Sequence, residues 1–127
     1  MKVNPNMSKY DYMLENSKNH MDSIALTFDD KKITYEELFE SINKYAKLLY
    51  SKGVRKGDLI GICTLNTPEA VYLVYALNLL GAVVVGYSPF DNKERIKNDI
   101  DLTMPKMVIT TDFSYGSFKE LEKSLNI

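Results

Sequence analysis

The side chains that most often carry catalysis or bind metals are scarce in this sequence. Its 127 residues include one histidine, His20, and one cysteine, Cys63. The two residues do not have the spacing of zinc ligands, so no zinc site is expected. His20 lies in a polar leading segment and is expected on the surface, whereas Cys63 lies in an apolar run and is expected in the core. Because catalytic triads are assembled in space, spacing alone leaves a triad open.

Glycine-rich motifs that bind phosphate groups are also missing. A phosphate-binding loop needs GxxxxGK[ST], and a dinucleotide site needs GxGxxG after a strand, because backbone amides and a helix N-terminus must surround the anion. The sequence contains neither. Residues 53–58, Gly-Val-Arg-Lys-Gly-Asp, hold two glycines and two cations. They follow a predicted helix and precede a predicted strand, which is the reverse order, so we interpret them as a turn.

Three short apolar runs predict the strands that would position any site. They lie near residues 59–63, 83–86 and 107–110. The first two have the composition of interior strands, and the first should be covered on both faces. The predicted helices between the strands imply right-handed βαβ crossovers. The expected fold class is therefore α/β, a mostly parallel sheet with helices on both faces.

Capping residues mark where the helices begin. Thr34 with Glu37 forms a capping box for a helix over residues 34–52, which Gly53 ends. Similar signals predict helices that start at Thr67-Pro68, at Asp91 with Glu94, and at Ser117 with Glu120. The helix at 68–80 is apolar nearly all round, so it should be enclosed by other protein.

The start of the chain differs in composition from the rest. Residues 1–22 form a polar leader, in which apolar side chains at helical spacing predict a short helix. An apolar run at 24–28, four polar residues and Ile33 predict a β-hairpin, which we expect at an edge of the sheet. We therefore divide the chain into a leader, residues 1–22, and an α/β unit, residues 23–127.

Composition and charge exclude several classes of partner. The chain has 16 basic and 17 acidic side chains and a net charge of −1, so no positive field favours nucleic acid. The longest apolar stretch, residues 76–85, is interrupted by Asn78 and Gly81 and falls short of the roughly 20 residues that span a bilayer, so no membrane partner is expected. With one cysteine and no apolar signal segment, we expect a cytoplasmic protein.

The geometry of open parallel sheets indicates where a ligand would bind. Ligands lie beyond the carboxyl ends of the strands, which here are the segments 66–67, 86–90 and 110–112. Such segments more often only connect elements, and these contain no complete catalytic set.

Four segments are informative through their order and spacing. They read Ile33-Thr34-Tyr35-Glu36-Glu37-Leu38, Gly53-Val54-x-x-Gly57-Asp58, Asn66-Thr67-Pro68-Glu69 and Ala76-Leu77-x-x-x-Gly81-Ala82-Val83. Together they resemble the N-terminal part of AMP-forming acyl-CoA synthetases and their adenylation-domain relatives, and residues 106–110 resemble the next strand of that family. The resemblance runs from about residue 10 to 125. It identifies residues 23–127 as an incomplete N-terminal subdomain of an AMP-binding synthetase.

The resemblance implies an acid-thiol ligase. ATP and a carboxylic acid would give an acyl adenylate and pyrophosphate, and a thiol, usually of CoA, would then take the acyl group, with Mg²⁺ required. The family's phosphate loop, ribose-binding acidic residue and catalytic lysine lie downstream of this region. No catalytic residue is therefore expected here, and the 127 residues alone should be inactive. The implied partners are a small carboxylic acid and the remainder of a synthetase chain. An apolar face meant for that remainder should promote self-association.

The resemblance also points to candidate neighbours of CoA. In short-acyl members, the loops after the second and third strands lie near the CoA nucleotide. By the resemblance alone, Tyr87, Ser88, Pro89 and the segment from Asp112 to Gly116 are the candidates. Where the family often has Asn or Asp before the proline, this chain has serine.

Two alternatives remain open. Glu94-Arg95-Ile96 resembles peptide-synthetase amino-acid adenylation domains, although residues 82–85 lack their usual Ala-Tyr pair. A self-contained α/β binding or signalling module would also fit the length. A receiver domain, however, needs an acidic cluster for magnesium, and the loops here offer Asn66, Ser88 and Asp112.

Overall fold

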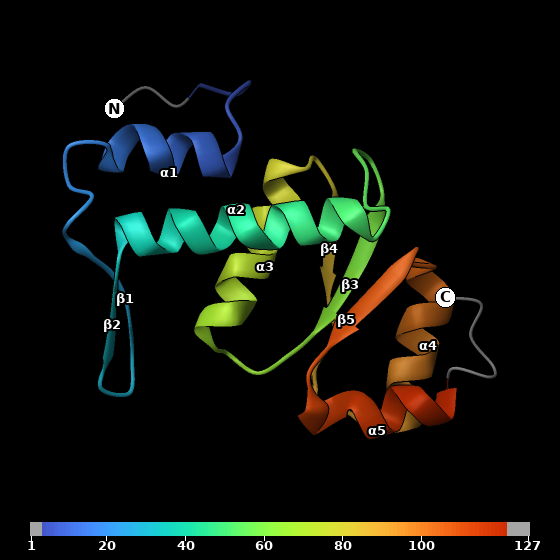
Figure 1. Cartoon of the computed structure of the whole chain (residues 1–127). Helices are drawn as coiled ribbons and strands as arrows, with labels where there is room; N and C mark the ends of the chain where they lie inside the picture. The colour runs from blue at the N-terminus through green and yellow to red at the C-terminus, as the bar shows by residue number, and fades with distance from the viewer. Residues whose placement is uncertain (1–3, 122–127) are drawn as a thin grey trace.

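A three-stranded parallel sheet lies at the centre of the α/β unit. The structure, a computed structural model, describes residues 4–121. The sheet consists of β3 (Leu59–Cys63), β4 (Val83–Gly86) and β5 (Met107–Thr110), in the order β4-β3-β5 (Figure 1). Both pairings are parallel. The three predicted strands and the α/β fold class are confirmed.

The position of β4 differs from the prediction. Its apolar sequence predicted an interior strand, but within residues 4–121 it lies at an edge of the sheet. Val83 and Val84 are 52% and 36% exposed. A short apolar run is compatible with either position, because the number of neighbouring strands is decided by distant parts of the chain.

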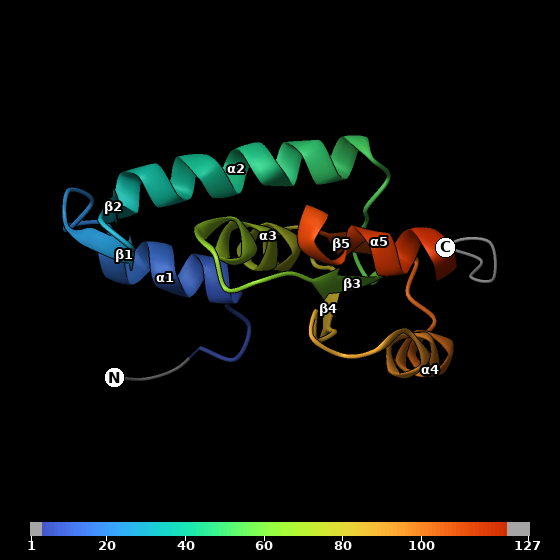
Figure 2. The same ribbon diagram turned by 90° about the horizontal axis from the view of Figure 1, so that it is seen from below.

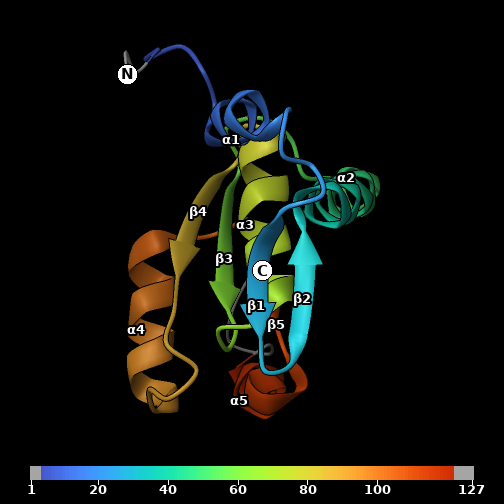
Figure 3. The same ribbon diagram turned by 90° about the vertical axis from the view of Figure 1, so that its left-hand side faces the viewer.

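Helices cover both faces of the sheet. One face carries α2 (Tyr35–Ser51) and α3 (Pro68–Leu79), and the other carries α4 (Lys93–Thr103) and α5 (Asp112–Leu121) (Figures 2 and 3). Side chains of a strand alternate between faces. As a result, β3 contributes Ile60 and Ile62 to the core beneath α2 and α3, and Cys63 to the cluster beneath α4 and α5.

The longest helix, α2, begins and packs as its sequence predicts. The Glu37 amide donates to Thr34 Oγ1 at 3.2 Å, and the Thr34 amide donates to Glu37 Oε2 at 3.0 Å, which completes the capping box. Its buried residues follow a helical period and face α3; they are Leu38, Phe39, Ile42, Ala46 and Leu49.

The polar leader contributes to this same core. Helix α1 (Lys9–Ser17) packs on α3 and buries Tyr10, whose ring meets Phe39 edge-on at 5.5 Å between centroids. The Tyr10 amide donates to Asn78 Oδ1, and the Asn43 side chain donates to the Tyr10 hydroxyl, both at 3.1 Å. The predicted leading helix is confirmed, and it is attached to the α/β unit.

The predicted hairpin forms, but not at the edge of the parallel sheet. Strands β1 (Ile24–Phe28) and β2 (Lys31–Thr34) pair antiparallel as a separate two-stranded sheet. The hairpin packs on the start of α2 through side chains such as Ile33, which is 3% exposed. The expectation of a sheet edge was wrong, because strand propensity indicates an extended backbone but not its hydrogen-bonding partner.

Two predicted helix starts are also wrong. Asn92, not Asp91, caps α4 and accepts a hydrogen bond from the Arg95 amide at 2.8 Å. Helix α5 begins at Asp112, so Ser117 lies within it rather than capping it. The capping pattern is short and recurs by chance within helices. The expected last turn near Leu125 lies outside the described residues. None of the helices within residues 4–121 is long and apolar enough to span a bilayer.

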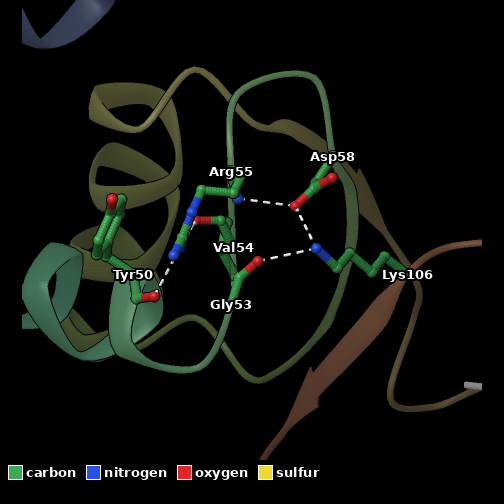
Figure 4. Close-up of polar contacts among 6 residues, drawn as sticks. All are labelled: Tyr50, Gly53, Val54, Arg55, Asp58 and Lys106. Carbon is green, nitrogen blue, oxygen red and sulfur yellow. Dashed lines mark hydrogen bonds and ion pairs between the residues drawn. The ribbon is translucent and has the colours of Figure 1, made fainter.

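The turn between α2 and β3 is tied to the start of β5 by an ion pair. Gly53 and Gly57 have φ of 96° and 86°, which glycine adopts without strain. Lys106 Nζ lies 2.8 Å from both Asp58 Oδ2 and the Gly53 carbonyl oxygen, and the Arg55 amide donates to Asp58 Oδ2 at 2.7 Å (Figure 4). The interpretation of residues 53–58 as a turn is confirmed.

This arrangement predicts a pH-dependent contribution to stability. The hydrogen bond from Lys106, followed by that from the Arg55 amide, lowers the pKa of Asp58. A lowered folded-state pKa stabilises the protein above the unfolded pKa of about 3.9, and this contribution is lost as pH falls through the folded value. Asp58→Asn should therefore lower the urea midpoint at about pH 7, and the difference from the parent chain should vanish at acidic pH.

The control for this prediction is an exposed ion pair on a single helix. Lys97 and Asp101 pair at 2.6 Å on α4, with side chains 41% and 50% exposed. Asp101→Asn should shift the midpoint less, because an exposed pair within a helix contributes little. An Asp58→Asn shift of equal size at pH 3 and pH 7 would contradict the assignment.

Candidate functional site

The carboxyl ends of the parallel strands form the candidate site. The strand order places the end of β3 between the ends of β4 and β5. The candidate loops at Tyr87 to Pro89 and at Asp112 to Gly116 therefore lie on opposite sides of β3. A ligand touching both would have to cross the end of that strand.

Tyr87 is a core residue. It is 6% exposed and belongs to the cluster formed by Cys63, Ile96, Ile100 and Phe118. Its hydroxyl is hydrogen-bonded to Thr103 Oγ1 on α4, and its amide donates to the Ile62 carbonyl at 2.8 Å. Burial raises the pKa of the Tyr87 hydroxyl, the Thr103 hydrogen bond opposes the shift, and Asp99 adds to it. The side chain orients the loop and stays neutral.

The two residues after Tyr87 are accessible. Ser88 is exposed and Pro89 is half-buried. Ser88 Oγ accepts a hydrogen bond from the Phe90 amide at 3.3 Å, and the Ser88 carbonyl accepts one from the Asp91 amide at 3.3 Å. These bonds make a tight turn, which presents Phe90 with 76% of its surface exposed.

Hydroxyl groups join the ends of β3 and β5. Thr110 Oγ1 and Ser114 Oγ are 2.7 Å apart, and each lies 3.1 Å from the Cys63 carbonyl oxygen. Ser114 is 3% exposed, so these bonds satisfy a buried hydroxyl. Thr111 Oγ1, next along the chain, is buried without a hydrogen-bond partner among the described residues.

The segment from Asp112 to Gly116 is helical rather than a loop. It forms the first turns of α5, and both Asp112 and Gly116 are exposed. The Ser114 and Tyr115 amides donate to the Thr111 carbonyl at 3.1 Å and 2.9 Å, which begins the helix directly after β5. The prediction of a loop here was wrong, because nothing in Thr-Thr-Asp distinguishes a loop from an immediate helix start.

Neither the one cysteine nor the one histidine of the chain supplies an accessible reactive group at the carboxyl ends of the strands. Cys63 is fully buried, and burial raises the pKa of its thiol; the Ser114 hydrogen bond lowers it and Asp91 raises it. A protonated, inaccessible thiol is a core residue, as predicted. His20 is exposed between α1 and β1, also as predicted. Among the side chains that the structure describes, no group of three or more His, Cys, Asp or Glu could hold a metal ion.

Comparison with known proteins identifies the family of this chain. The family model described as AMP-binding enzyme matches residues 13–126. The chain belongs to the family of AMP-binding enzymes. The match covers most of the leading helix, both sheets and α5, so the scaffold described above is the family's scaffold.

Relatives of two kinds are found within the family. The chain is 36% identical over 124 residues to an acetyl-coenzyme A synthetase of Bartonella quintana, covering 92% of this chain and 18% of that protein. It is 33% identical over 89 residues to a linear gramicidin synthase of Brevibacillus parabrevis, covering 70% of this chain and 1% of that protein. The chain thus spans less than a fifth of either relative.

A solved structure supports the fold. The NpsA N-terminal subdomain of Klebsiella oxytoca superposes with a TM-score of 0.79 at 30% identity, covering 83% of this chain and 28% of that one. The two chains therefore share this α/β scaffold.

Three residues that shape the site were missed by sequence reasoning. Gly61 in β3 accommodates the Tyr87 ring, Thr103 holds its hydroxyl, and Ser114 ties α5 to β3. A glycine inside a strand is a recognised sign of close approach, so Gly61 could have been found. Thr103 and Ser114 carried no such signal, because their partners are distant in sequence.

Proposed function

We propose that this chain is the N-terminal scaffold of an ATP-dependent acyl-CoA synthetase. The similarity to an acetyl-coenzyme A synthetase along 92% of the chain is the observation that carries the proposal. In the proposed reaction, a carboxylate oxygen attacks the α-phosphorus of ATP and pyrophosphate leaves. The sulfur of CoA then attacks the acyl carbon, and AMP leaves with the bonding electron pair.

The described residues would position substrates rather than react with them. Cys63 is buried, His20 lies between α1 and β1, and the described side chains include no group of three or more His, Cys, Asp or Glu that could hold Mg²⁺. The residues that act on ATP and hold the metal would therefore belong to other parts of the enzyme. This agrees with the small share of the acetyl-coenzyme A synthetase that the chain covers.

For CoA, we propose Ser88, Pro89, Asp112 and Gly116 as neighbours, with Tyr87 as a positioning residue. Three of the four neighbours are exposed and Pro89 is half-buried, so a ligand beyond the sheet could reach them. The Tyr87 side chain is instead enclosed by the core and would act by holding the Ser88 turn in place. Tyr87→Phe should therefore raise the Michaelis constant for CoA less than a substitution of Ser88 by a bulky residue does.

The test uses a chimera in which this chain replaces the aligned part of the Bartonella quintana synthetase. Acetate-dependent exchange of pyrophosphate into ATP and formation of acetyl-CoA are expected from the chimera, and neither is expected from the 127 residues alone. Exchange by the 127 residues alone would contradict the proposal. So would a chimera that unfolds cooperatively and sediments like the parent enzyme but has no exchange activity.

The second candidate is an adenylation domain of a peptide synthetase. It is favoured by the similarity to the linear gramicidin synthase and to NpsA, which also occurs in an artificially fused Adenylation-PCP di-domain NRPS. The two candidates differ in the thiol that accepts the acyl group, which is CoA in the first and a carrier-protein phosphopantetheine in the second. The family match speaks against the third interpretation, a self-contained signalling module.

A further inference from the structure

The hydroxyl group of Thr103 takes part in two hydrogen bonds, and one of them fixes the direction of the other. Thr103 Oγ1 donates to the Asp99 carbonyl oxygen, one turn earlier in α4, at 2.7 Å. It is also hydrogen-bonded to the Tyr87 hydroxyl. A threonine hydroxyl has only one proton to donate. Because that proton is directed at Asp99, the Tyr87 hydroxyl must be the donor and Thr103 the acceptor.

This direction makes the two hydroxyl groups unequal. If the Tyr87 hydroxyl is removed, Thr103 still donates to Asp99, so no polar group is stranded. If the Thr103 hydroxyl is removed, the Tyr87 hydroxyl loses its acceptor although the residue is only 6% exposed. A buried donor without an acceptor is more unfavourable than the absence of both partners. The Tyr87 ring should therefore leave its place when Thr103 alone is changed.

A displaced ring would move the chain that follows β4. The Tyr87 amide is held by the Ile62 carbonyl at 2.8 Å, and the ring edge lies so close to Gly61 that a Cβ atom there would overlap it. The ring therefore cannot move toward β3. It can only swing away from the strand, and that rotation changes the direction in which the backbone enters Ser88.

We propose that Thr103 is a positioning residue for the turn at Ser88 and Pro89, and that it acts through the Tyr87 hydroxyl. The inference rests on the proposed function, because it takes CoA as the ligand at this turn. Both hydrogen bonds of Thr103 go to groups of this chain, so it is not itself a neighbour of CoA. Its contribution belongs to CoA binding and not to adenylate formation, which precedes CoA.

Steady-state kinetics of the Bartonella quintana chimera test this role. Thr103→Val keeps the shape of the side chain and places a methyl group where the hydroxyl was, so water cannot replace it. The Michaelis constant for CoA should rise at least about fivefold. Acetate-dependent pyrophosphate exchange, measured without CoA, should stay at the parent rate. An unchanged Michaelis constant for CoA, or an equal loss of exchange activity, would overturn the proposal.

Thr103→Ser and Ser17→Ala are the controls. Serine at position 103 keeps the acceptor, so the chimera should keep the Michaelis constant of the parent. Ser17 Oγ donates to the Met13 carbonyl at 2.7 Å, the same bond to the preceding turn, but it lies in α1, which packs on α3. Ser17→Ala should leave the Michaelis constant for CoA unchanged. A rise as large as that of Thr103→Val would assign the effect to general loosening and overturn the proposal.

A second substitution shows whether the effect passes through Tyr87. Tyr87→Phe, added to Thr103→Val, removes the stranded hydroxyl. The Michaelis constant for CoA should then fall to the value of Tyr87→Phe alone, because replacing both partners of a buried bond leaves no unpaired group. A double variant as poor as Thr103→Val would indicate direct contact of residue 103 with CoA and would overturn the proposal. If Thr103→Val does not fold, Thr103→Cys, whose thiol is a weak acceptor, replaces it with the same expectations.

Amide NMR signals of the 127-residue chain test the positioning without any activity. Thr103→Val should shift the signals of Ser88 and Phe90, and the double variant should show them where Tyr87→Phe alone does. Unmoved signals would overturn the proposal whatever the chimera does. A folded parent chimera without pyrophosphate exchange, together with the expected shifts, would remove the proposed function alone. An active chimera that does not respond to Thr103→Val would remove the role of Thr103 alone.

Discussion

Alanine at Gly61 is expected to lower the free energy of unfolding by about 2 to 3 kcal/mol through overpacking. Gly61 lies at the middle of the central strand, between Val85 and Val108. A Cβ atom there would overlap the Cε2 edge of the Tyr87 ring and lie 3.2 Å from Val108 Cγ2. The ring cannot move aside freely, because it is 6% exposed and its hydroxyl is bonded to Thr103. Urea unfolding of the 127-residue chain, followed by circular dichroism, measures the change.

Gly86 supplies the matched control. It lies in the neighbouring strand β4, and a Cβ atom there would meet nothing within 4 Å. Gly86→Ala should therefore change the free energy of unfolding by no more than about 0.5 kcal/mol. Equal effects of the two substitutions would show that backbone freedom, and not contact with Tyr87, explains the glycine.

A double-mutant cycle assigns the effect to the aromatic ring. In a Tyr87→Ala background the overlap is gone, so adding Gly61→Ala should be harmless or even favourable. The expected coupling energy exceeds about 1 kcal/mol, which is typical of residues in direct contact. Additive effects would contradict the proposed contact. The Ser88 turn follows Tyr87 directly, so the same cycle in the chimera would show whether the ring also controls the Michaelis constant for CoA.

Leu77→Ala is expected to have the largest effect on stability, about 3 to 4 kcal/mol. Leu77 is fully buried on α3, in the cluster that also contains Ile42 and Leu49 of α2 and Ile60 of the sheet. Truncation loses the transfer free energy of the removed atoms and leaves a cavity between two helices and a strand, which cannot all close inward. The measurement is again urea unfolding of the 127-residue chain.

The control is the same substitution at an exposed leucine. Leu102 on α4 is 82% exposed, so Leu102→Ala should change stability by less than about 0.5 kcal/mol. Leu77 does not lie at the carboxyl ends of the strands. The Michaelis constants of the chimera should therefore be unchanged at temperatures where the variant is folded. A change in the Michaelis constant for acetate or CoA without loss of stability would contradict a purely structural role.

Local sequence was a reliable guide where an element is decided by its neighbours in the chain. The capping box of Thr34 and Glu37 forms as expected, because both partners are within three residues. Gly53 adopts the positive φ that ends α2. The same reasoning failed at α4 and α5, where Asp91 and Ser117 fit a capping pattern but Asn92 and Asp112 mark the actual starts. A short polar pattern limits the choice of cap without selecting one.

For the candidate site, too, some properties followed from local sequence and others did not. Its location at the carboxyl ends of β3, β4 and β5 could be predicted, because three parallel strands with intervening helices must place their loops at one end. Whether the side chain of each candidate residue is buried or accessible could not be predicted. Tyr87 lies in a loop by sequence, yet its ring is enclosed by α4 and β3 and bonded to Thr103. Its burial depends on contacts with residues that are distant in the chain, such as Gly61.

The sequence by itself determined that the chain is an α/β unit and that it contains neither glycine-rich phosphate-binding motif, since apolar periodicity, caps and such motifs are all local properties. The tertiary structure alone decided which of the three strands is central and which side chains at the site are accessible. The physical reason is that hydrogen-bond pairing and side-chain burial join residues that are far apart in the chain. The face on which α5 lies is such a property, because it depends on the packing of Phe118 with Ile96 and Ile100 of α4.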